Sequence, residues 1–310
     1  IIDARIPNCM FADPDPVHLA TGQSFSKIEV DSGEPLELAE VDIAVAFYAM
    51  LLPDFLWEFF GLPPVRAGDF DVNEINGRPV GPTEVVFPVF KAVPMGWNQA
   101  LGICQEVHEL IARRVAGVTE DNFLRDGRAV PRLRRSLDQF IHTEYVDNFL
   151  AFSQVPGLAH SAAAGADHEL RKVGLPTHPV SSGRGGTALG WDFDDVLPRV
   201  GISRRGVWRL RLAIQHVVAR GKVSGHQLSR LVGHFTFRAL IRRELLSLLN
   251  AVYAFMRVNW FEETTLWPAV RRELRWCAGL IHLGTRNLGA SWSDRYLVFD
   301  ASELGMGVVT

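Results

Sequence analysis

The sequence predicts an α+β fold, with an antiparallel sheet and its packed helices first and a mostly helical part after them. Residues 140–153 place aromatic and β-branched residues around a short polar turn, which is typical of a β-hairpin. From Val207 to Leu283, apolar residues recur at the spacing of amphipathic helices. With 310 residues, 47% hydrophobic and 22% charged, the chain is long enough for a sizeable core and two or more subdomains.

The first part of the chain predicts little regular structure. Residues 1–11 indicate a strand that runs into a turn at Pro7. Residues 12–40 are rich in Asp, Pro, Ser and Gly, which indicates loop with one short helix within 16–25. An apolar strand then ends near Asp42, and a short helix or turn follows it. A lone carboxylate at the end of an apolar strand is expensive to bury unless it is paired or binds a metal.

The next part predicts a surface excursion followed by a long helix. Residues 54–84 indicate a β excursion with a tight turn at Asn76-Gly77. Residues 85–93 indicate a strand that Pro88 breaks. After a turn at 94–98, an amphipathic helix is predicted from 99 to 115, with one face made of Leu101, Cys104, Val107, His108 and Ile111.

The predicted hairpin at 140–153 follows a charged surface loop and would carry Asp147 and Asn148 at its tip. An ordinary Asp-Asn turn is the simpler interpretation of this stretch alone. Residues 157–173 predict an alanine-rich helix, and residues 187–193 predict a pair of strands. The stretch 181–186 is glycine-rich but lacks the context of a phosphate-binding loop, so it is predicted to be a flexible loop.

The C-terminal part predicts a series of helices. They cover residues 208–219, 228–237, 239–257 and 267–283, and the second of them opens at Ser224-Gly225-His226-Gln227. Residues 295–309 indicate a strand, a turn and the start of a second strand. The histidines on these helices are expected to be surface or core residues rather than ligands.

Charge is distributed unevenly along the chain. The net charge of −3 argues against a general nucleic-acid binder. However, one basic segment from 199 to 243 contains no Asp or Glu, and its cations are Arg199, Arg204, Arg205, Arg209, Arg211, Arg220, Lys222, Arg230, Arg238, Arg242 and Arg243. Such a segment indicates either a face for a polyanion or a solvated helical surface.

Several features exclude other classes. The three cysteines are scattered, which indicates reduced thiols and no zinc site. The chain has no apolar run near the length of a membrane span and no signal peptide, so an intracellular location (cytoplasm or nucleus) is expected. Both ends fall within strand-like sequence, so the chain is expected to be a fragment of a longer polypeptide.

Two aspartates could form a metal site. If Asp42 and Asp147 lie on neighbouring strands, their carboxylates would share a pair of divalent ions. Two metals about 3.5–4 Å apart are the usual apparatus of in-line phosphoryl transfer. One ion lowers the pKa of an attacking hydroxyl, and the other neutralises the leaving group.

Seven short motifs occur in a fixed order. They are Ile1-Ile2-Asp3-Ala4-Arg5-Ile6-Pro7-Asn8, Asp42-Ile43-Ala44-Val45-Ala46-Phe47-Tyr48, Val93-Pro94-Met95-Gly96-Trp97-Asn98-Gln99-Ala100, Tyr145-Val146-Asp147-Asn148, Ala188-Leu189-Gly190-Trp191, Leu228-Ser229-Arg230-Leu231-Val232-Gly233-His234-Phe235, and Val298-Phe299-Asp300-Ala301-Ser302-Glu303-Leu304-Gly305. In this order they resemble the motifs of reverse transcriptases from retroelements, in particular the gypsy-like and DIRS-type retrotransposons.

The resemblance implies a right-hand polymerase palm, followed by a mostly helical, basic thumb and connection and by the first strands of a ribonuclease H-like domain. The implied parts are partial fingers at 1–41, the first palm motif at 42–53, a fingers or palm insertion at 54–92, palm at 93–195, thumb and connection at 196–290, and the truncated ribonuclease H-like start at 291–310.

The resemblance also implies an activity, RNA-directed DNA polymerisation with two Mg²⁺ (or Mn²⁺) ions. The implied partners are an RNA or DNA template-primer, deoxynucleoside triphosphates and other domains of the same retroelement polyprotein, without a membrane. The implied site residues are Asp42, Asp147 and Asn148 for catalysis, the first two also as metal ligands; Arg5, Phe47, Met95 and Gly96 for the nucleotide; Tyr145, Leu189, Gly190, Trp191, Arg230 and Arg238 for primer and template; and Asp300 for the ribonuclease H part.

The sequence departs from the family pattern in three places. Asn148 stands where the family usually has a second hairpin Asp, and an amide brings no charge to a metal. The Lys usually found a few residues after Gly174 is missing, with Val180 near its place. Asp300 alone cannot hold the metals of a nuclease. The alternatives are therefore a degenerate relative that binds nucleic acid without polymerising and, from another class, a metal-dependent phosphohydrolase.

Overall fold

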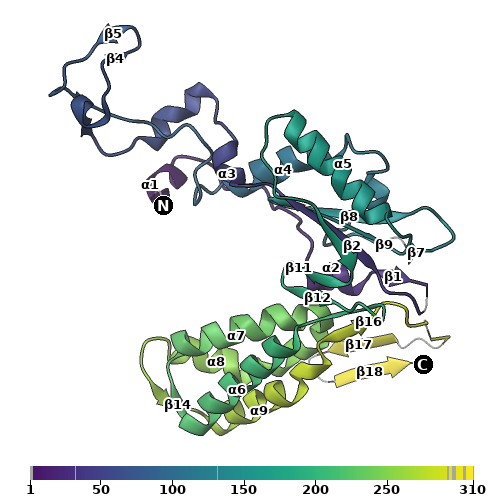
Figure 1. Cartoon of the computed structure of the whole chain (residues 1–310). Helices are drawn as coiled ribbons and strands as arrows, with labels where there is room; N and C mark the ends of the chain where they lie inside the picture. Colours follow the sequence, from purple (N-terminus) through teal and green to yellow (C-terminus); the bar gives the residue numbers. More distant parts are fainter. Residues whose placement is uncertain are drawn as a thin grey trace. The chain divides into compact units, whose positions relative to one another are not determined.

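The computed structural model describes residues 3–31, 33–130, 132–291, 293–294, 298–302 and 305–309, without side chains from residue 299 onward (Figure 1). Its mixture of helices and strands confirms the α+β class. The chain forms two compact units. The first contains residues 1–24, 37–130 and 138–183, and the second contains residues 25–36, 131–137 and 184–310. No helix in the described part is long and apolar enough to cross a membrane. The finer division expected from the sequence stays a prediction.

A four-stranded sheet forms the centre of the first unit. Its strand order is β10 (Ser181–Arg184), β2 (Glu37–Asp42), β9 (Asn148–Ser153) and β8 (Phe140–Tyr145). β9 pairs antiparallel with both β2 and β8. The predicted hairpin is thus confirmed, and the strand before Asp42 is confirmed as well.

Two helices pack on this sheet, α4 (Ala100–Ala112) on β8 and α5 (Leu158–Lys172) on β2 and β9, and the two helices also touch each other (Figure 1). Four alanines of α5, Ala159, Ala162, Ala163 and Ala166, are buried, and their small side chains let the helix approach the strands closely. Both helices were predicted. Leu101, however, was expected on the buried face of α4 and is 40% exposed. Gln105, a polar residue, is buried instead.

The N-terminal residues differ from the prediction. A short helix, α1 (Arg5–Asn8), stands where a strand was expected. Its start is fixed by Asp3, whose carboxylate accepts the backbone N–H of Arg5 at 3.1 Å. Two further short helices are α2 (Gly22–Ser26) and α3 (Ala46–Ala49). α3 confirms the short helical segment predicted after Asp42.

The surface excursion contains only short elements, which are η1 (Asp54–Phe60), β3 (Val65–Arg66), η2 (Ala67–Phe70), β4 (Glu74–Ile75), β5 (Arg78–Pro79) and β6 (Val85–Val86). The turn at Asn76 and Gly77 is confirmed, with positive φ at both residues. The strand predicted over 85–93 is reduced to β6. Pro88 cannot donate a ladder hydrogen bond, and only isolated bridges continue beyond it.

The glycine-rich stretch predicted to be a flexible loop is also different. It forms β10, an edge strand beside β2. Serine and glycine have low β propensity, so the sequence gives no sign of the pairing. The free edge of β2 supplies the hydrogen-bond partners that make this segment a strand. The charged loop before the hairpin contains η3 (Glu120–Asn122).

The second unit contains a sheet of order β11 (Gly186–Ala188), β12 (Trp191–Phe193), β13 (Arg199–Gly201) and β16 (Thr285–Asn287), all antiparallel. This confirms the pair of strands predicted at 187–193. The strands β1 (Glu29–Val30) and β7 (Arg132–Leu133) form a separate parallel pair in the same unit.

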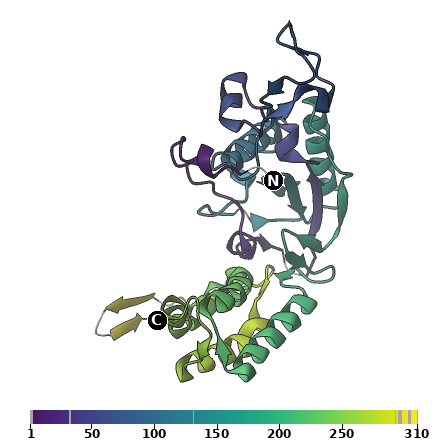
Figure 2. The same ribbon diagram turned by 90° about the vertical axis from the view of Figure 1, so that its left-hand side faces the viewer.

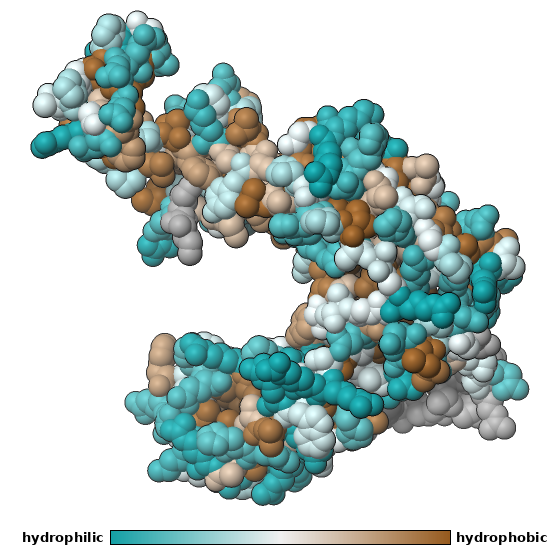
Figure 3. Space-filling view, viewed as in Figure 1, coloured by the Kyte–Doolittle hydropathy of each residue, from teal (hydrophilic) through white to brown (hydrophobic). Residues whose placement is uncertain are grey.

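The predicted helical series is found in the second unit, as green to yellow ribbons in Figure 2, except that residues 239–257 form a 3-10 segment and a shorter α-helix instead of one helix. Its elements are α6 (Arg204–Arg220), β14 (Lys222–Val223), α7 (Gly225–Ala239), η4 (Leu240–Leu248), α8 (Asn250–Val258), β15 (Thr264–Thr265), α9 (Pro268–Leu280) and η5 (Ile281–Leu283). Ser224 and Gln227 form a capping box that starts α7. The surface of these helices in Figure 3 is mostly hydrophilic.

The chain's last described strands are β17 (Val298–Ser302) and β18 (Gly305–Val309), which pair antiparallel. They match the two strands expected there. Glu303 and Leu304 lie outside the described residues, and so does the side chain of Asp300.

Candidate active site

The strand register gathers the candidate catalytic residues on one face of the first unit's sheet. Asp42 pairs with Asn148, and Asn148 pairs with Tyr145. Directly paired residues point to the same face of a sheet. The neighbouring residues Val41 and Phe149 point the other way, into the core formed with α4 and α5. The face opposite the two helices therefore carries Asp42, Asn148 and Tyr145 together.

The hairpin turn brings Asp147 to the same place. The turn residues are Val146 and Asp147, whereas the sequence placed Asp147 and Asn148 at the tip; Asn148 is already the first residue of β9. The carbonyl of Asp147 accepts the backbone N–H of Ile43 at 2.8 Å. This bond ties the turn to the end of β2, directly after Asp42.

The electrostatics of this corner are those of crowded negative charge. Burial raises the pKa of Asp42, and the neighbouring charge of Asp147 raises it further. Burial likewise raises the pKa of Glu40, with added effects from Asp42 and Asp147. The thiol of Cys104 has its pKa raised to about 11, by burial first and then by Asp147. A cation at this corner would favour the ionised carboxylates.

Two residues of this corner were not identified from the sequence. Glu40 lies two residues before Asp42 and so shares its face of β2; the period of a strand would have revealed it. His178 follows the segment that ends α5. Its backbone N–H donates to the Asp42 carbonyl at 2.8 Å, and its Nε2 lies 3.7 Å from Asp42 Oδ2. No sequence signal indicates that contact, because β10 and its approach fold back beside β2 only in the tertiary structure.

Helix α4 holds the hairpin turn through two buried side chains. Gln105 donates from Nε2 to the Glu144 carbonyl at 2.9 Å and accepts the Val146 N–H at 2.8 Å. His108 Nδ1 lies 3.0 Å from the Val146 carbonyl. Burial lowers the pKa of His108, so the neutral ring donates this bond from Nδ1. These contacts fix the backbone on which Asp147 stands, and Val146 adopts a left-handed φ of 57° there.

Asn148 has a direct effect on its neighbour. Its Nδ2 donates to Asp147 Oδ1 at 2.9 Å. A carboxylate oxygen that accepts an amide N–H has less electron density for a cation than a free one. The side-chain oxygen of Asn148 can still act as an uncharged ligand.

The corner offers few metal ligands. No group of three His, Cys, Asp or Glu side chains within the described ranges is arranged to hold a metal ion. Asp42 and Asp147 remain as two carboxylates. Mg²⁺ is commonly bound through one or two carboxylates, with water and substrate phosphates completing its shell. The residues present therefore fit magnesium that is shared with a phosphorylated substrate, and they do not fit an all-protein cage.

The nucleotide-binding candidates are joined through Asn8. Its Nδ2 donates to the Gly96 carbonyl at 3.0 Å, and its Oδ1 accepts the Asn98 N–H at 2.9 Å. This links α1, which carries Arg5, to the turn that contains Met95 and Gly96. Met95 is 48% exposed, and Gly96 has a φ of 101°, a conformation that favours glycine.

The side chains of Arg5 and Phe47 are less available for contact with a nucleotide than the resemblance implies. The Arg5 guanidinium is 2.5 Å from the Asp3 carboxylate, and this hydrogen-bonded pair lowers the pKa of Asp3 to about 2. Both side chains are exposed, so the pair is weak and a triphosphate could replace Asp3. Phe47 is partly buried against the core of the first unit.

The primer and template candidates of the second unit gather around α7. Leu189 and Gly190 form the turn between β11 and β12, and Trp191 stacks on Phe237 with ring centres 4.9 Å apart. Arg238 is partly buried, and burial and Arg209 lower its pKa. Arg230 is exposed on the same helix.

The comparison with known proteins finds a likeness in fold. No protein-family model matches the chain, and no curated protein matches it. Among solved structures, the chain is similar to the foamy viral protease-reverse transcriptase in complex with an RNA/DNA hybrid, with a TM-score of 0.55 and 11% sequence identity. The match covers 91% of this chain but 31% of that one. At this identity the likeness establishes the fold alone: the chain has a reverse-transcriptase-like fold.

Proposed function

We propose that this chain is the polymerase part of a retrotransposon reverse transcriptase of the gypsy-like or DIRS type, an RNA-directed DNA polymerase. One observation carries the proposal. The β2–β9 register and the Ile43–Asp147 hydrogen bond bring two partly buried aspartates, Asp42 and Asp147, to one corner of the sheet. Paired carboxylates at such a corner suit metal-assisted phosphoryl transfer.

Asp42 and Asp147 would hold the two Mg²⁺ (or Mn²⁺) ions. When bound, the ions would activate the primer 3′-hydroxyl and neutralise the leaving pyrophosphate. The chain's own residues would then position the reactants. Arg5 would bind the triphosphate, Gly96 would let the backbone approach the nucleotide, and Phe47 would lie under its sugar.

The remaining parts of the proposal follow the resemblance. Met95 would pack near the base pair, and Tyr145 would contact the primer terminus. The basic second unit would bind template and primer phosphates, through Arg230 and Arg238 among others. Asp300 would belong to the start of a ribonuclease H-like domain, and further retroelement domains would share the polyprotein. Such a polymerase would act inside the cell, in the cytoplasm or nucleus.

A second candidate function is nucleic-acid binding without polymerisation. The observation that favours it is the bond from Asn148 Nδ2 to Asp147 Oδ1, which occupies a proposed metal ligand with an uncharged donor. A degenerate relative would keep the fold and the basic surface while losing metal affinity.

Primer extension on an RNA template, with Mg²⁺ and separately with Mn²⁺, distinguishes the two functions. The first predicts extension that Asp42→Ala abolishes. No extension by the parent chain, together with extension by Asn148→Asp, would establish the second. Extension that survives Asp42→Ala would refute the assignment of the site.

A further inference from the structure

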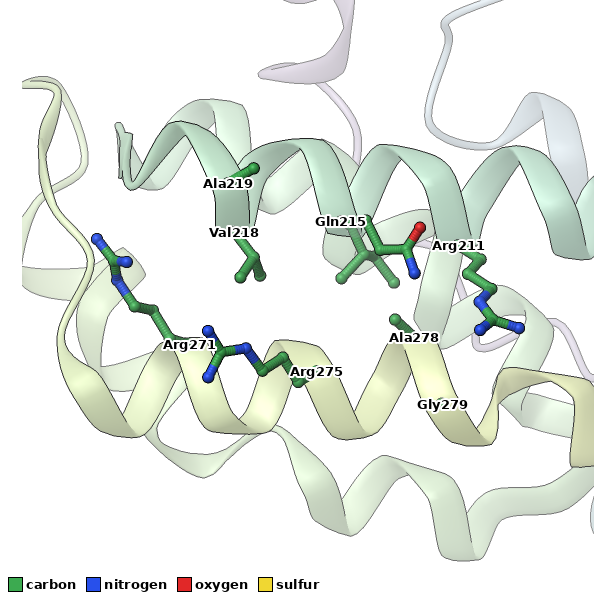
Figure 4. Close-up of a pocket in the computed structure, with 9 residues that line it drawn as sticks. Arg211, Gln215, Val218, Ala219, Arg271, Arg275, Ala278 and Gly279 are labelled. Atoms are coloured by element: carbon green, nitrogen blue, oxygen red, sulfur yellow. The ribbon is translucent and has the colours of Figure 1, made fainter.

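The groove between helices α6 and α9 is lined by arginines from both sides. It encloses about 530 Å³. Figure 4 shows Arg211 on α6 and Arg271 and Arg275 on α9, and all three line the groove. The rest of the lining is small, apolar or an amide, and no Asp or Glu belongs to it.

None of these three guanidinium groups forms an ion pair in the described part of the chain. Arg271 donates a long hydrogen bond of 3.4 Å to the Gly221 carbonyl. Arg211 lies over the ring of Trp208, with its guanidinium carbon 5.2 Å from the ring centre. Three cations around one groove repel one another, and an anion would relieve that repulsion.

The chemistry of the lining identifies the anion. Guanidinium groups match phosphate oxygens through paired N–H donors. Arg271 and Arg275 are one turn apart on α9, about 6 Å along its axis, so they can contact successive groups of a linear polyanion. Trp208 is 57% exposed beside Arg211 and offers a face on which a base can stack. Gln215 adds a side-chain amide to the lining of the groove.

We propose that the α6–α9 groove binds the phosphodiester backbone of a single nucleic-acid strand, with a base stacked on Trp208. Packed helices have axes about 8–10 Å apart, so the furrow between them admits one strand rather than a duplex. This site is separate from the α7 residues Arg230 and Arg238. It deepens the proposed function by locating a single-strand contact on the second unit, and it can be tested without polymerisation.

The test measures binding of fluorescein-labelled oligo-dT and oligo-U to the whole chain by fluorescence anisotropy across a series of salt concentrations. Arg271→Gln combined with Arg275→Gln should weaken binding roughly tenfold and lower the salt slope by about 1.4, because each lost phosphate contact on a single strand contributes about 0.7. Arg272→Gln combined with Arg257→Gln, which removes the same charge, is the matched control; Arg257 is exposed on α8 and does not line the groove. Arg272 lies on α9 and is exposed, but it does not line the groove either.

The outcomes separate the possibilities. If the control and the groove variant lose oligonucleotide affinity equally, net charge alone explains the loss, and the proposal is overturned. Binding of inorganic tripolyphosphate or of a poly-Glu peptide that equals or exceeds oligonucleotide binding would overturn it in favour of a small-anion site or an acidic-protein site. Photocrosslinking of an iodouracil-containing oligonucleotide to the unmodified chain tests the site without any substitution. It should label Trp208, and labelling confined to the first unit would refute the groove.

Primer extension by the parent chain, measured beside the binding assay, distinguishes this inference from the proposed function. A chain that never extends a primer but loses binding only in the groove variants would disprove the polymerase and leave the groove established.

Discussion

Replacing Gln105 with leucine should loosen the turn that carries Asp147. Gln105 is 3% exposed, and its side-chain amide forms hydrogen bonds with the Glu144 carbonyl and the Val146 N–H. Leucine has a similar volume, so the packing is kept while both backbone groups lose their partner. A buried backbone group without a partner costs about 1–3 kcal/mol. The two losses together should lower the free energy of unfolding of the first unit by about 2–6 kcal/mol.

Hydrogen exchange of the native chain is the sharpest assay, because it resolves single amides. The Val146 amide should lose its protection in Gln105→Leu and keep it in Gln105→Glu, which retains the accepting oxygen. Glu106→Leu is the control, since Glu106 is exposed one residue further along α4. If Val146 keeps its protection in Gln105→Leu and chemical denaturation shows a loss below about 1 kcal/mol, the helix does not hold the turn.

Three further predictions concern other sites. The pKa values of Asp42 and Glu40 are raised in the native state, so both carboxyls stabilise that state while they are protonated. This stabilisation is complete below about pH 4 and is lost as the pH rises through the raised pKa values. Mg²⁺ binds the ionised carboxylates, which are more abundant at higher pH. It should therefore raise the melting temperature more at pH 8 than at pH 5, and Asp42→Asn should remove that difference. Glu273→Ala should destabilise the second unit by about 3 kcal/mol in chemical denaturation, because the carboxylate accepts the N–H groups of Ala251 and Val252, each at 2.9 Å, at the start of α8. Gly96→Ala should cost about 1–2 kcal/mol by the same assay, because its φ is positive.

Each of these three predictions has an outcome that would contradict it. A magnesium effect that is independent of pH, or unchanged in Asp42→Asn, would show that the ion binds elsewhere. Glu273→Gln keeps the side-chain volume and one accepting oxygen, so it should lose part of what Glu273→Ala loses; no loss of stability in Glu273→Gln would mean that packing, not capping, is the cause. Gly61→Ala has open space and negative φ, so it is the control for Gly96→Ala, and equal effects would remove the argument from φ.

Local sequence determined most of the helices and the central hairpin of this protein. The helix α5 follows from its alanine pattern, α7 from its capping box, and the hairpin from aromatic and β-branched residues on both sides of a turn. These signals lie within a few residues of one another, so the chain carries them whatever its surroundings. The presence of Asp42 and Asp147 at strand ends was also visible, because a carboxylate after an apolar strand stands out.

Tertiary structure decided which residues surround those two aspartates. The pairing of β2 with β9 sets Asp42 beside Asn148, and β10 is a strand only because it completes the edge of β2. His178 reaches Asp42, and Gln105 reaches the hairpin, from segments whose local sequence predicts loop and ordinary helix. The arginine groove likewise joins α6 to α9, about sixty residues apart by their numbering. Such contacts depend on long-range packing, in which the partner's position, rather than the residue's own neighbours, sets the environment.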